Sequence, residues 1–520
     1  MAFLSASWLR ADPWRTLLIL VACCYGIVQL IFVTPGMGLG WDESIYVSQV
    51  DPRAPAADFI APRARGITWL VAPVVLVTSS TEALRVYLCL LSALALYASF
   101  RIWSRVRAGA VAPLAALLFA SLWLALFYGG QAMPNLWVAF GAVAAVGCFL
   151  LCVRSGSGRG PVAGLALSVA AVGLLRPPDS LWLVLALAAA LAWPAWRRVR
   201  VGAALVAGLV VGWADWIAEA YVRFGGFAAR WQAAGAANET GLHVSLLEHV
   251  RALNGPLLCR PPAHCGPIPL PWLLWASTIP VLVLLGLYAA RRRGHLAACA
   301  LPAVAGLLMG APYVFLVGYA APRFLLPAYA LLALPIAYGV LRLAERPFRP
   351  VLAGLLTAGL LAQFALQGLT LDKVVAPRLA KRQADVEVAR ALSGLDLRPP
   401  CLVYGEHAAM IAYRVGCESH TVLRWPQQSA APAPIRAAQS AGKQVVAVDE
   451  GRHAAAPFLE GWERRPLPGA RPGTWQAYLP LASSVPQAGR PAAVGGAGEL
   501  GHDAHTRWGS PPQLVQHAGR

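Results

Sequence analysis

Apolar runs close to the length of a bilayer recur along this chain, and they constrain its fold more than any other feature. Crossing the hydrocarbon core takes roughly 20 mostly apolar residues, and such runs follow one another from about residue 16 to about residue 370. Over the whole chain 58% of the residues are hydrophobic and only 13% are charged, whereas soluble domains carry about 25% charged residues. The sequence therefore predicts a polytopic α-helical membrane protein and excludes a soluble globular enzyme.

Eleven of these runs are candidate transmembrane helices. They lie at residues 17–33, 84–100, 109–127, 134–153, 161–175, 179–196, 201–222, 271–290, 297–318, 324–342 and 351–370. The first run follows Arg10 and Arg15 and lacks the cleavage site of a secretory signal, so we expect it to be kept as a helix. Together the spans predict a transmembrane domain over residues 1–372.

The arginines give this domain an orientation. Clusters of arginine occupy alternate connections, at residues 101–107, 154–159, 197–200, 291–293 and 342–349, on the same side as the N-terminus. The positive-inside rule places that side in the cytoplasm of a multi-pass cell-membrane protein. A first outer loop (35–83), a short turn (128–133), a large outer loop (223–270) and the C-terminal region then lie outside. Most of the net charge of +19 comes from arginines that hold the predicted cytoplasmic loops in place, so it predicts no nucleic-acid partner.

The C-terminal region has a different pattern. Residues 401–416 read as a buried strand, a turn and a helix, and residues 433–449 read as a helix, a glycine and a strand. This alternation predicts a small extracytoplasmic α/β domain over residues 373–481. Residues 482–520 are rich in Gly, Pro, Ala and His without an apolar period, and we expect them to be disordered.

Two cysteine pairs fall in the predicted outer regions. Cys259 and Cys265 bracket a proline-rich step in the large outer loop, and Cys401 and Cys417 bracket the strand and helix of the tail. In an oxidising compartment both pairs are candidate disulfides, and free thiols are the alternative.

Charge is scarce here, so acids at the membrane surface stand out. Asp42 and Glu43 follow the first span on the outer side, flanked by Trp41, Ile45 and Tyr46, which are typical of the membrane interface. A carboxylate at this level is hydrated at little cost, and two solvated loop acids are the alternative interpretation.

The acidic pair, with Tyr46 three residues beyond Glu43, resembles the first-loop signature of the GT-C glycosyltransferases. This superfamily includes the protein O-mannosyltransferases and the aminoarabinose transferases of lipid A. Further stretches resemble the same enzymes in order and sidedness: "RGITWLVAPVVL" from residue 65, "TEALRVYLCLLSALA" from residue 81, "QAMPNLWVAFGAVAA" from residue 131, "LLRPPDSLWLVLALAAAL" from residue 174 and "YAAPRFLLPAYALLALPIAYG" from residue 319.

The resemblance implies an enzyme that moves a sugar from a polyprenyl-phosphate carrier to a cell-envelope glycan, lipid or protein on the outer face. Such a transfer needs a general base for the acceptor hydroxyl, and Asp42 is the candidate, with Glu43 sharing that role or binding sugar hydroxyls. Tyr46 is expected to contact the substrate. The lipid-phosphate leaving group calls for arginine, for which Arg65 and Arg323 are the candidates.

Arg65 and Arg323 have an alternative role as interfacial anchors. Arg63 and Arg176 are weaker candidates for the phosphate site. Relatives often carry an acid where this chain has Met133, Pro134 and Asn135, and the chain has no Asp-X-Asp motif. We therefore expect neither a divalent metal nor another cofactor.

A second charged group lies at the outer end of the 201–222 span. Asp215, Glu219 and Arg223 are four residues apart in turn, so they share one helix face. They either line a substrate site or form a ladder of ion pairs inside the bundle.

Two other functions compete with a transferase. One is a transporter or flippase for lipid-linked precursors, although we find no internal repeat of the kind such proteins often have. The other is a membrane scaffold whose outer domain binds a partner. Neither gives Asp42 a chemical role, so a substitution there discriminates between them and the enzyme.

Overall fold

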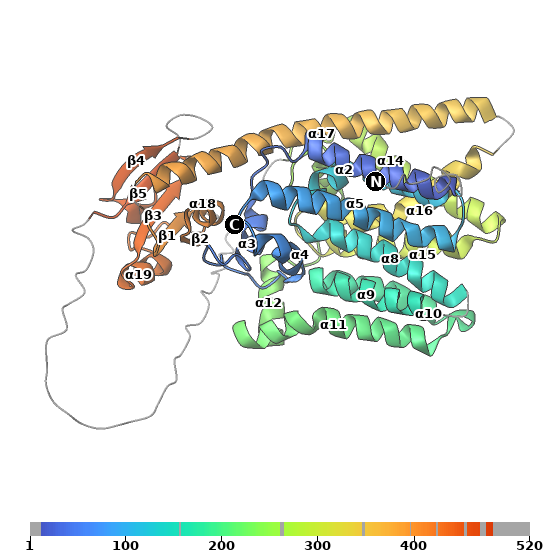
Figure 1. The fold of residues 1–520 in the computed structure, drawn as a ribbon, viewed down its shortest axis with the longest axis horizontal. Helices are drawn as coiled ribbons and strands as arrows, with labels where there is room; N and C mark the ends of the chain where they lie inside the picture. The colour runs from blue at the N-terminus through green and yellow to red at the C-terminus, as the bar shows by residue number, and fades with distance from the viewer. Residues whose placement is uncertain are drawn as a thin grey trace, which may run out of the picture.

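The computed structural model has two parts, a long bundle of helices and a small α/β domain at one end of it (Figure 1). It describes residues 12–154, 158–260, 265–345, 349–395, 397–422, 425–451, 455–468 and 475–481. The predicted disordered tail, 482–520, lies outside the described residues.

Each of the eleven predicted spans is mostly helical. Eight helices in the described residues have the length and apolarity to cross a membrane: α2 (Pro13–Phe32), α5 (Thr81–Val106), α8 (Pro134–Arg154), α11 (Val199–Arg223), α14 (Leu270–Arg292), α15 (Leu296–Phe315), α16 (Leu326–Leu343, preceded by the short η2, Pro322–Leu325) and α17 (Arg349–Ser393). Two further helices are shorter, α9 (Arg159–Leu175) with 17 residues and α10 (Pro177–Leu191) with 15. The chain is thus a multi-pass membrane protein, and the number of helices that cross stays a prediction.

The predicted span at 109–127 is two helices. α6 (Val111–Ala120) and α7 (Trp123–Gly129) meet at an angle of 76°. The break is stabilised from α17, because the side-chain oxygen of Gln367 accepts the backbone N–H of Trp123 at 2.9 Å. An unsatisfied N–H inside a membrane costs several kcal/mol, so this hydrogen bond lets the chain turn within the bundle.

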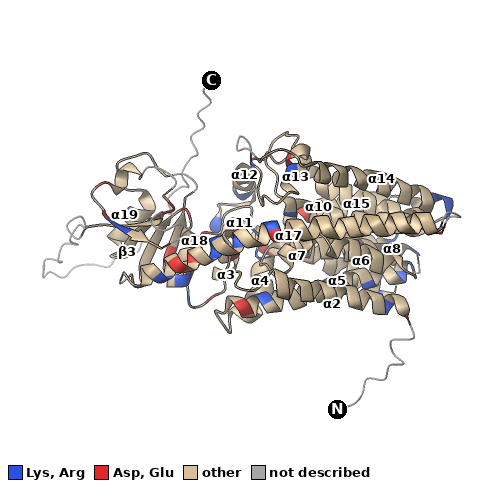
Figure 2. Ribbon diagram, turned by 90° about the horizontal axis from the view of Figure 1, so that it is seen from above, with Lys and Arg blue, Asp and Glu red and all other residues tan. Residues whose placement is uncertain are grey.

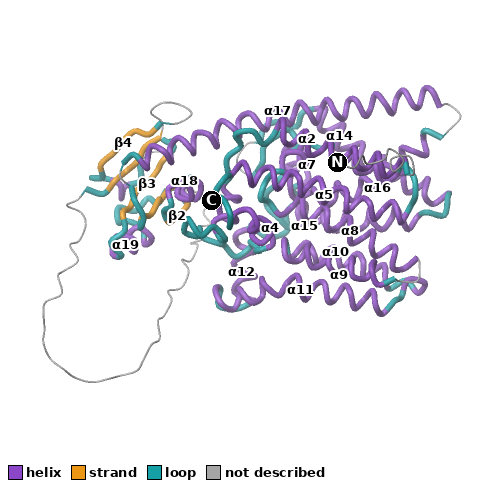
Figure 3. Tube along the Cα trace, in the orientation of Figure 1, coloured by secondary structure: helices purple, strands orange, loops and turns teal. Residues whose placement is uncertain are grey.

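Four short helices lie in the two loops that the arginine pattern predicts to be outside. The first loop contains α3 (Trp41–Ser48) and α4 (Gly66–Val75), and the large loop contains α12 (Phe227–Ala237) and α13 (Leu246–Ala252). The tubes in Figure 3 show the long helices side by side along the bundle, with α3, α4 and α12 at the end nearest the α/β domain. Basic residues mark the opposite end, where α14 finishes with Arg291 and Arg292 (Figure 2).

The α/β domain is built on a mixed five-stranded sheet. Its strands are β1 (Cys401–Gly405), β2 (Glu418–Thr421), β3 (Gln444–Asp449), β4 (Glu463–Leu467) and β5 (Trp475–Leu479), in the order β2-β1-β3-β5-β4. β1 is parallel to β2 and β3, whereas β5 is antiparallel to β3 and β4. The helices are α18 (Ala408–Val415) and α19 (Ala433–Ser440). The strand–helix alternation predicted from the sequence is thus present.

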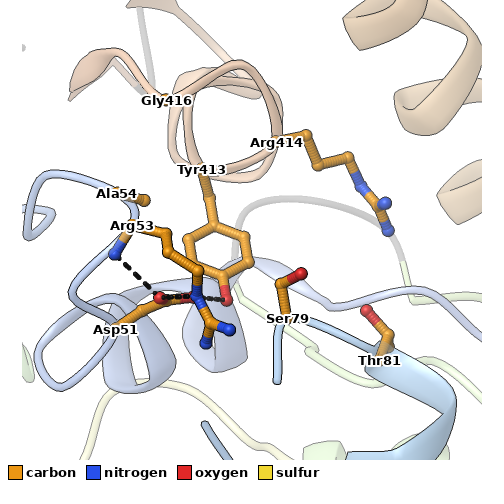
Figure 4. Close-up of a pocket in the computed structure, with 8 residues that line it drawn as sticks. All are labelled: Asp51, Arg53, Ala54, Ser79, Thr81, Tyr413, Arg414 and Gly416. Atoms are coloured by element: carbon orange, nitrogen blue, oxygen red, sulfur yellow. Dashed lines mark hydrogen bonds and ion pairs between the residues drawn. The ribbon is translucent and has the colours of Figure 1, made fainter. Parts of the chain in front are cut away.

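One helix joins the two parts. α17 is 45 residues long and runs without a break from the apolar segment into the α/β domain, so the predicted boundary at residue 372 falls inside it. The domain is also tied to the first outer loop, because the Tyr413 hydroxyl on α18 donates to the buried Asp51 carboxylate at 2.6 Å. A pocket of about 280 Å³ lies at this junction, lined also by Arg53, Ser79 and Arg414 (Figure 4).

Candidate active site

The acidic pair of the first outer loop lies on α3, directly after the first membrane helix. Gly40 precedes the helix, and its backbone N–H donates to the Glu43 side chain at 2.9 Å, which closes the first turn. Successive residues of an α-helix point about 100° apart. Asp42 and Glu43 therefore face different surroundings, although the sequence presents them as one pair.

Glu43 is buried inside the bundle, with 1% of its side chain exposed. It accepts two hydrogen bonds from Arg85 on α5, at 2.5 and 2.9 Å, and one from the backbone N–H of Ala132 at 2.8 Å. Arg382 of α17 lies 3.2 Å away. Burial alone would raise the pKa of Glu43, but Arg85 and Arg382 outweigh it and lower that pKa. This carboxylate connects four segments of the protein.

Asp42 faces a partly open space, with 24% of its side chain exposed. Arg63 of the first outer loop donates to Oδ1 at 2.8 Å, and Arg323 of η2 lies 3.4 Å from Oδ2. Burial acts to raise the pKa of Asp42, but Arg63 first and then Arg323 outweigh it and lower that pKa. The carboxylate is therefore ionised at neutral pH and lies between two guanidinium groups.

Arg63 is held by aromatic rings. Its guanidinium carbon lies 5.3 Å from the ring centre of Trp41 and 5.2 Å from that of Tyr46, both on α3. Tyr46 is itself buried and packs edge-on against Phe59. These contacts hold Arg63 beside Asp42 and place Tyr46 next to the ion pair of Arg63 with Asp42.

Arg65 has a different partner from Arg63. It donates twice to Glu219 of α11, at 3.0 and 2.6 Å, and lies over the ring of Phe59. Glu219 also contacts Arg223 and Arg230, at 3.1 and 2.9 Å. The structure brings Arg63, which the sequence ranked lower, to Asp42 and ties Arg65 into this separate cluster.

The charged face of α11 forms part of the predicted series of ion pairs. Glu219 and Arg223 form the expected pair four residues apart, while Asp215 is half-buried on the same face. Within the described residues no ion pair is found for Asp215. Three arginines, two of them from outside α11, surround Glu219, which favours the ion-pair interpretation of this face.

A second carboxylate near the site was not singled out from the sequence. Asp179, at the start of α10, is buried, accepts a hydrogen bond from the Tyr313 hydroxyl and lies 3.3 Å from Arg176. Arg176 also lies over the rings of Tyr313 and Phe324, next in sequence to Arg323. A buried acid needs a partner, and the neighbouring arginine in "RPPDS" was the available signal.

Both predicted cysteine pairs are bridged. Cys259 is joined to Cys265 and Cys401 to Cys417. The backbone of Cys259 also exchanges two hydrogen bonds with Ala320, at 2.7 and 2.8 Å. The first disulfide thus lies where the large outer loop pairs with the segment that leads to Arg323.

No group of three or more His, Cys, Asp and Glu with the geometry of a metal site occurs in the described part of the chain. The absence of a divalent metal from the reaction stays a prediction.

Structural comparison places this arrangement in a known fold. ArnT from Cupriavidus metallidurans, solved bound to undecaprenyl phosphate, superposes with a TM-score of 0.60 over 91% of this chain and 99% of that chain, at 15% identity. Its apo structure gives a TM-score of 0.61 at 13% identity. The fold is that of the GT-C membrane glycosyltransferases.

Two more distant GT-C enzymes share it. The archaeal oligosaccharyltransferase AglB from Archaeoglobus fulgidus, in complex with an inhibitory peptide and a dolichol-phosphate, has a TM-score of 0.52 at 13% identity, covering 92% of this chain and 76% of that chain. The arabinofuranosyltransferase AftD from Mycobacteria has a TM-score of 0.53 at 16% identity, covering 92% and 40%. No protein-family model and no curated protein matches the sequence. The GT-C fold expected from the first-loop resemblance is therefore present.

Proposed function

We propose that this protein is a membrane glycosyltransferase that moves a sugar from a polyprenyl-phosphate carrier to an acceptor of the cell envelope at the outer face of the membrane. The observation that carries the proposal is the ionised Asp42 between Arg63 and Arg323, at the end of a GT-C bundle that bears the α/β domain. The arginine clusters at the opposite end support a cytoplasmic N-terminus and an extracytoplasmic α/β domain.

In the proposed reaction, the acceptor hydroxyl attacks the anomeric carbon of the donor sugar. The new bond is acceptor oxygen to anomeric carbon, and the bond that breaks joins that carbon to the phosphate oxygen. The acceptor proton passes to the Asp42 carboxylate, and the bonding electrons leave with the lipid phosphate, which gains one negative charge. General-base assistance of this kind contributes about 10²–10⁴-fold to a rate.

The two arginines beside Asp42 suit the departing phosphate. A guanidinium group presents paired N–H donors that match phosphate oxygens, and it keeps its charge at any physiological pH. The Nε atoms of Arg63 and Arg323 are buried and have no hydrogen-bond partner in the described residues. We propose that both groups stabilise the lipid phosphate through these unpaired donors while they stay beside Asp42, and that Arg65 contributes to the shape of the first loop.

The roles of the other predicted residues follow from their contacts. We propose that Tyr46 orients Arg63 through its ring and that Glu43 holds α3 in the bundle, so that neither exchanges protons with the substrate. Glu219 supports the first outer loop through Arg65 and Arg230, and Asp215 lies on the same helix face without a proposed role.

The test is transfer of label from a panel of polyprenyl-phosphate sugars by the purified protein in lipid nanodiscs. Asp42→Asn should abolish transfer, and Asp58→Asn is a matched control, because Asp58 lies in the same loop with 74% of its side chain exposed. Full transfer by the Asp42→Asn variant would refute the catalytic assignment. Movement of labelled lipid across vesicles that is equal in wild type and Asp42→Asn, without transfer, would indicate a flippase instead.

A further inference from the structure

One arginine of the large outer loop contacts neither Asp42 nor Arg323 and is nevertheless completely buried. Arg230 lies on α12 with none of its surface exposed. Burying a guanidinium group is costly unless its donors are satisfied, so its contacts show what it does.

Its hydrogen bonds join the first outer loop to α11. Nε donates to the carbonyl of Ala61 at 3.2 Å, and Nη2 donates to the carbonyl of Arg63 at 3.0 Å. The remaining contacts are with α11, where Nη1 donates to the carbonyl of Trp216 at 2.7 Å and Nη2 to Glu219 at 2.9 Å.

Aromatic rings close around the same group. The guanidinium carbon lies 4.3 Å from the ring centre of Trp216 and 4.5 Å from that of Phe224. A cation–π contact attracts a guanidinium group to the face of an aromatic ring. The orientation of Arg230 is thus fixed by rings, carbonyls and a carboxylate together.

The backbone that Arg230 holds belongs to the residue that binds Asp42. The Arg63 carbonyl accepts from Arg230, and the Arg63 side chain donates to Oδ1 of Asp42 at 2.8 Å. A displacement of about 1 Å in a reacting constellation can cost about 10²-fold in rate, so the position of this backbone matters.

We propose that Arg230 is a positioning residue of the transferase, which sets the Arg63 guanidinium on Asp42 by clamping the backbone of residues 61–63. This inference rests on the proposed function. It assigns to the large outer loop the task of holding the site from outside the membrane. The same loop supports Arg323, through the backbone pairing of Cys259 with Ala320 and the carbonyl of Leu257, 3.5 Å from Arg323 Nη1.

The test compares Arg230→Gln and Arg230→Lys with Arg223→Gln in the transfer assay. Arg223 contacts the same Glu219 oxygen as Arg65, but 44% of its side chain is exposed, and within the described residues no hydrogen bond or ion pair joins it to the first outer loop. It is therefore the matched control. Arg230→Gln should lower kcat about 100-fold, as expected for a displaced site, with the acceptor KM little changed. Arg230→Lys keeps the positive charge but lacks the planar guanidinium group, so its kcat should lie between those of Arg230→Gln and Arg223→Gln.

A pH profile separates positioning from a loss of folded protein. The groups that act on the Asp42 carboxylate are Arg63, Arg323, Arg176, Tyr46 and Tyr128. With Arg63 displaced, Asp42 loses the strongest of the charges that lower its pKa, so that pKa rises. The acid limb of kcat should therefore move to higher pH in Arg230→Gln and stay in place in Arg223→Gln. Variants with normal kcat per folded molecule and an unshifted acid limb would overturn the proposal.

Hydrogen exchange of the peptide 57–66 tests the clamp without reference to activity. Exchange should be faster in both Arg230 variants than in wild type and unchanged in Arg223→Gln, and an unchanged rate in all three would also overturn the proposal. If wild type transfers no sugar from any donor while exchange responds as expected, the proposed function fails and the clamp stands. If wild type is active but neither the pH profile nor the hydrogen exchange changes in the Arg230 variants, the proposed role of Arg230 is wrong and the proposed function stands.

Discussion

Replacing Glu43 by glutamine distinguishes a structural carboxylate from a catalytic one. Glu43 accepts hydrogen bonds from Arg85 and from the backbone of Gly40 and Ala132, and Arg382 lies 3.2 Å away. The neutral amide would leave two buried guanidinium groups without a counter-charge. Removing one partner of a buried ion pair costs about 3–5 kcal/mol, which is a large part of the roughly 5–15 kcal/mol that stabilises a folded protein.

The measurement is thermal unfolding of the detergent-solubilised variant, beside transfer activity per folded molecule at a temperature where it remains folded. Asp42→Asn is the comparison, because the Asp42 side chain is 24% exposed and that of Glu43 only 1%, so water can partly replace the charge that is lost at Asp42. Glu43→Gln should melt well below Asp42→Asn and keep much more activity. A Glu43→Gln variant that melts like wild type but is as inactive as Asp42→Asn would refute this reasoning and make Glu43 a catalytic group.

A double substitution sharpens the result. If Glu43 and Arg85 act on each other, Glu43→Gln combined with Arg85→Gln should lose less stability than the sum of the two single changes, by about 0.5–3 kcal/mol. Strict additivity would mean that the contact between them does not contribute to stability.

Three further predictions concern the arginines, a disulfide and the domain junction. Arg63→Gln should reduce transfer more than Arg65→Gln and should move the acid limb of activity to higher pH, because Arg63, unlike Arg65, contacts the proposed base; equal losses and equal profiles would argue against the assignment. Reducing the bridge between Cys401 and Cys417 should destabilise the α/β domain by about 2–5 kcal/mol, seen as a lower melting temperature in reductant that Cys401→Ser reproduces. Tyr413→Phe should cost about 1–3 kcal/mol, because a buried carboxylate loses a donor; limited proteolysis should then cleave near the junction faster, and unchanged cleavage would contradict this docking role.

The parts of the site that were not predicted depend on contacts between residues far apart in the sequence, for which no local pattern gives evidence. Arg382 lies in a polar segment of the tail that gave no hint of contact with α3, and it reaches Glu43 only because α17 continues past the membrane. Arg230 follows Phe227 in an alanine-rich run, and an arginine among aromatic residues was the only available signal. The bend between α6 and α7 depends on Gln367, more than 200 residues away in sequence.

Most of the apolar helices, the ends that carry the arginine clusters and the acidic pair after the first span could be read from the amino-acid sequence. These properties depend on local composition and length, because the bilayer imposes a fixed thickness on every segment. The different environments of Asp42 and Glu43, and the pairing of Asp42 with Arg63 and not with Arg65, depend on how the helices and loops pack. The partner of a charged side chain is whichever opposite charge the packing brings within about 4 Å, and for Arg65 that charge is Glu219, 154 residues along the chain.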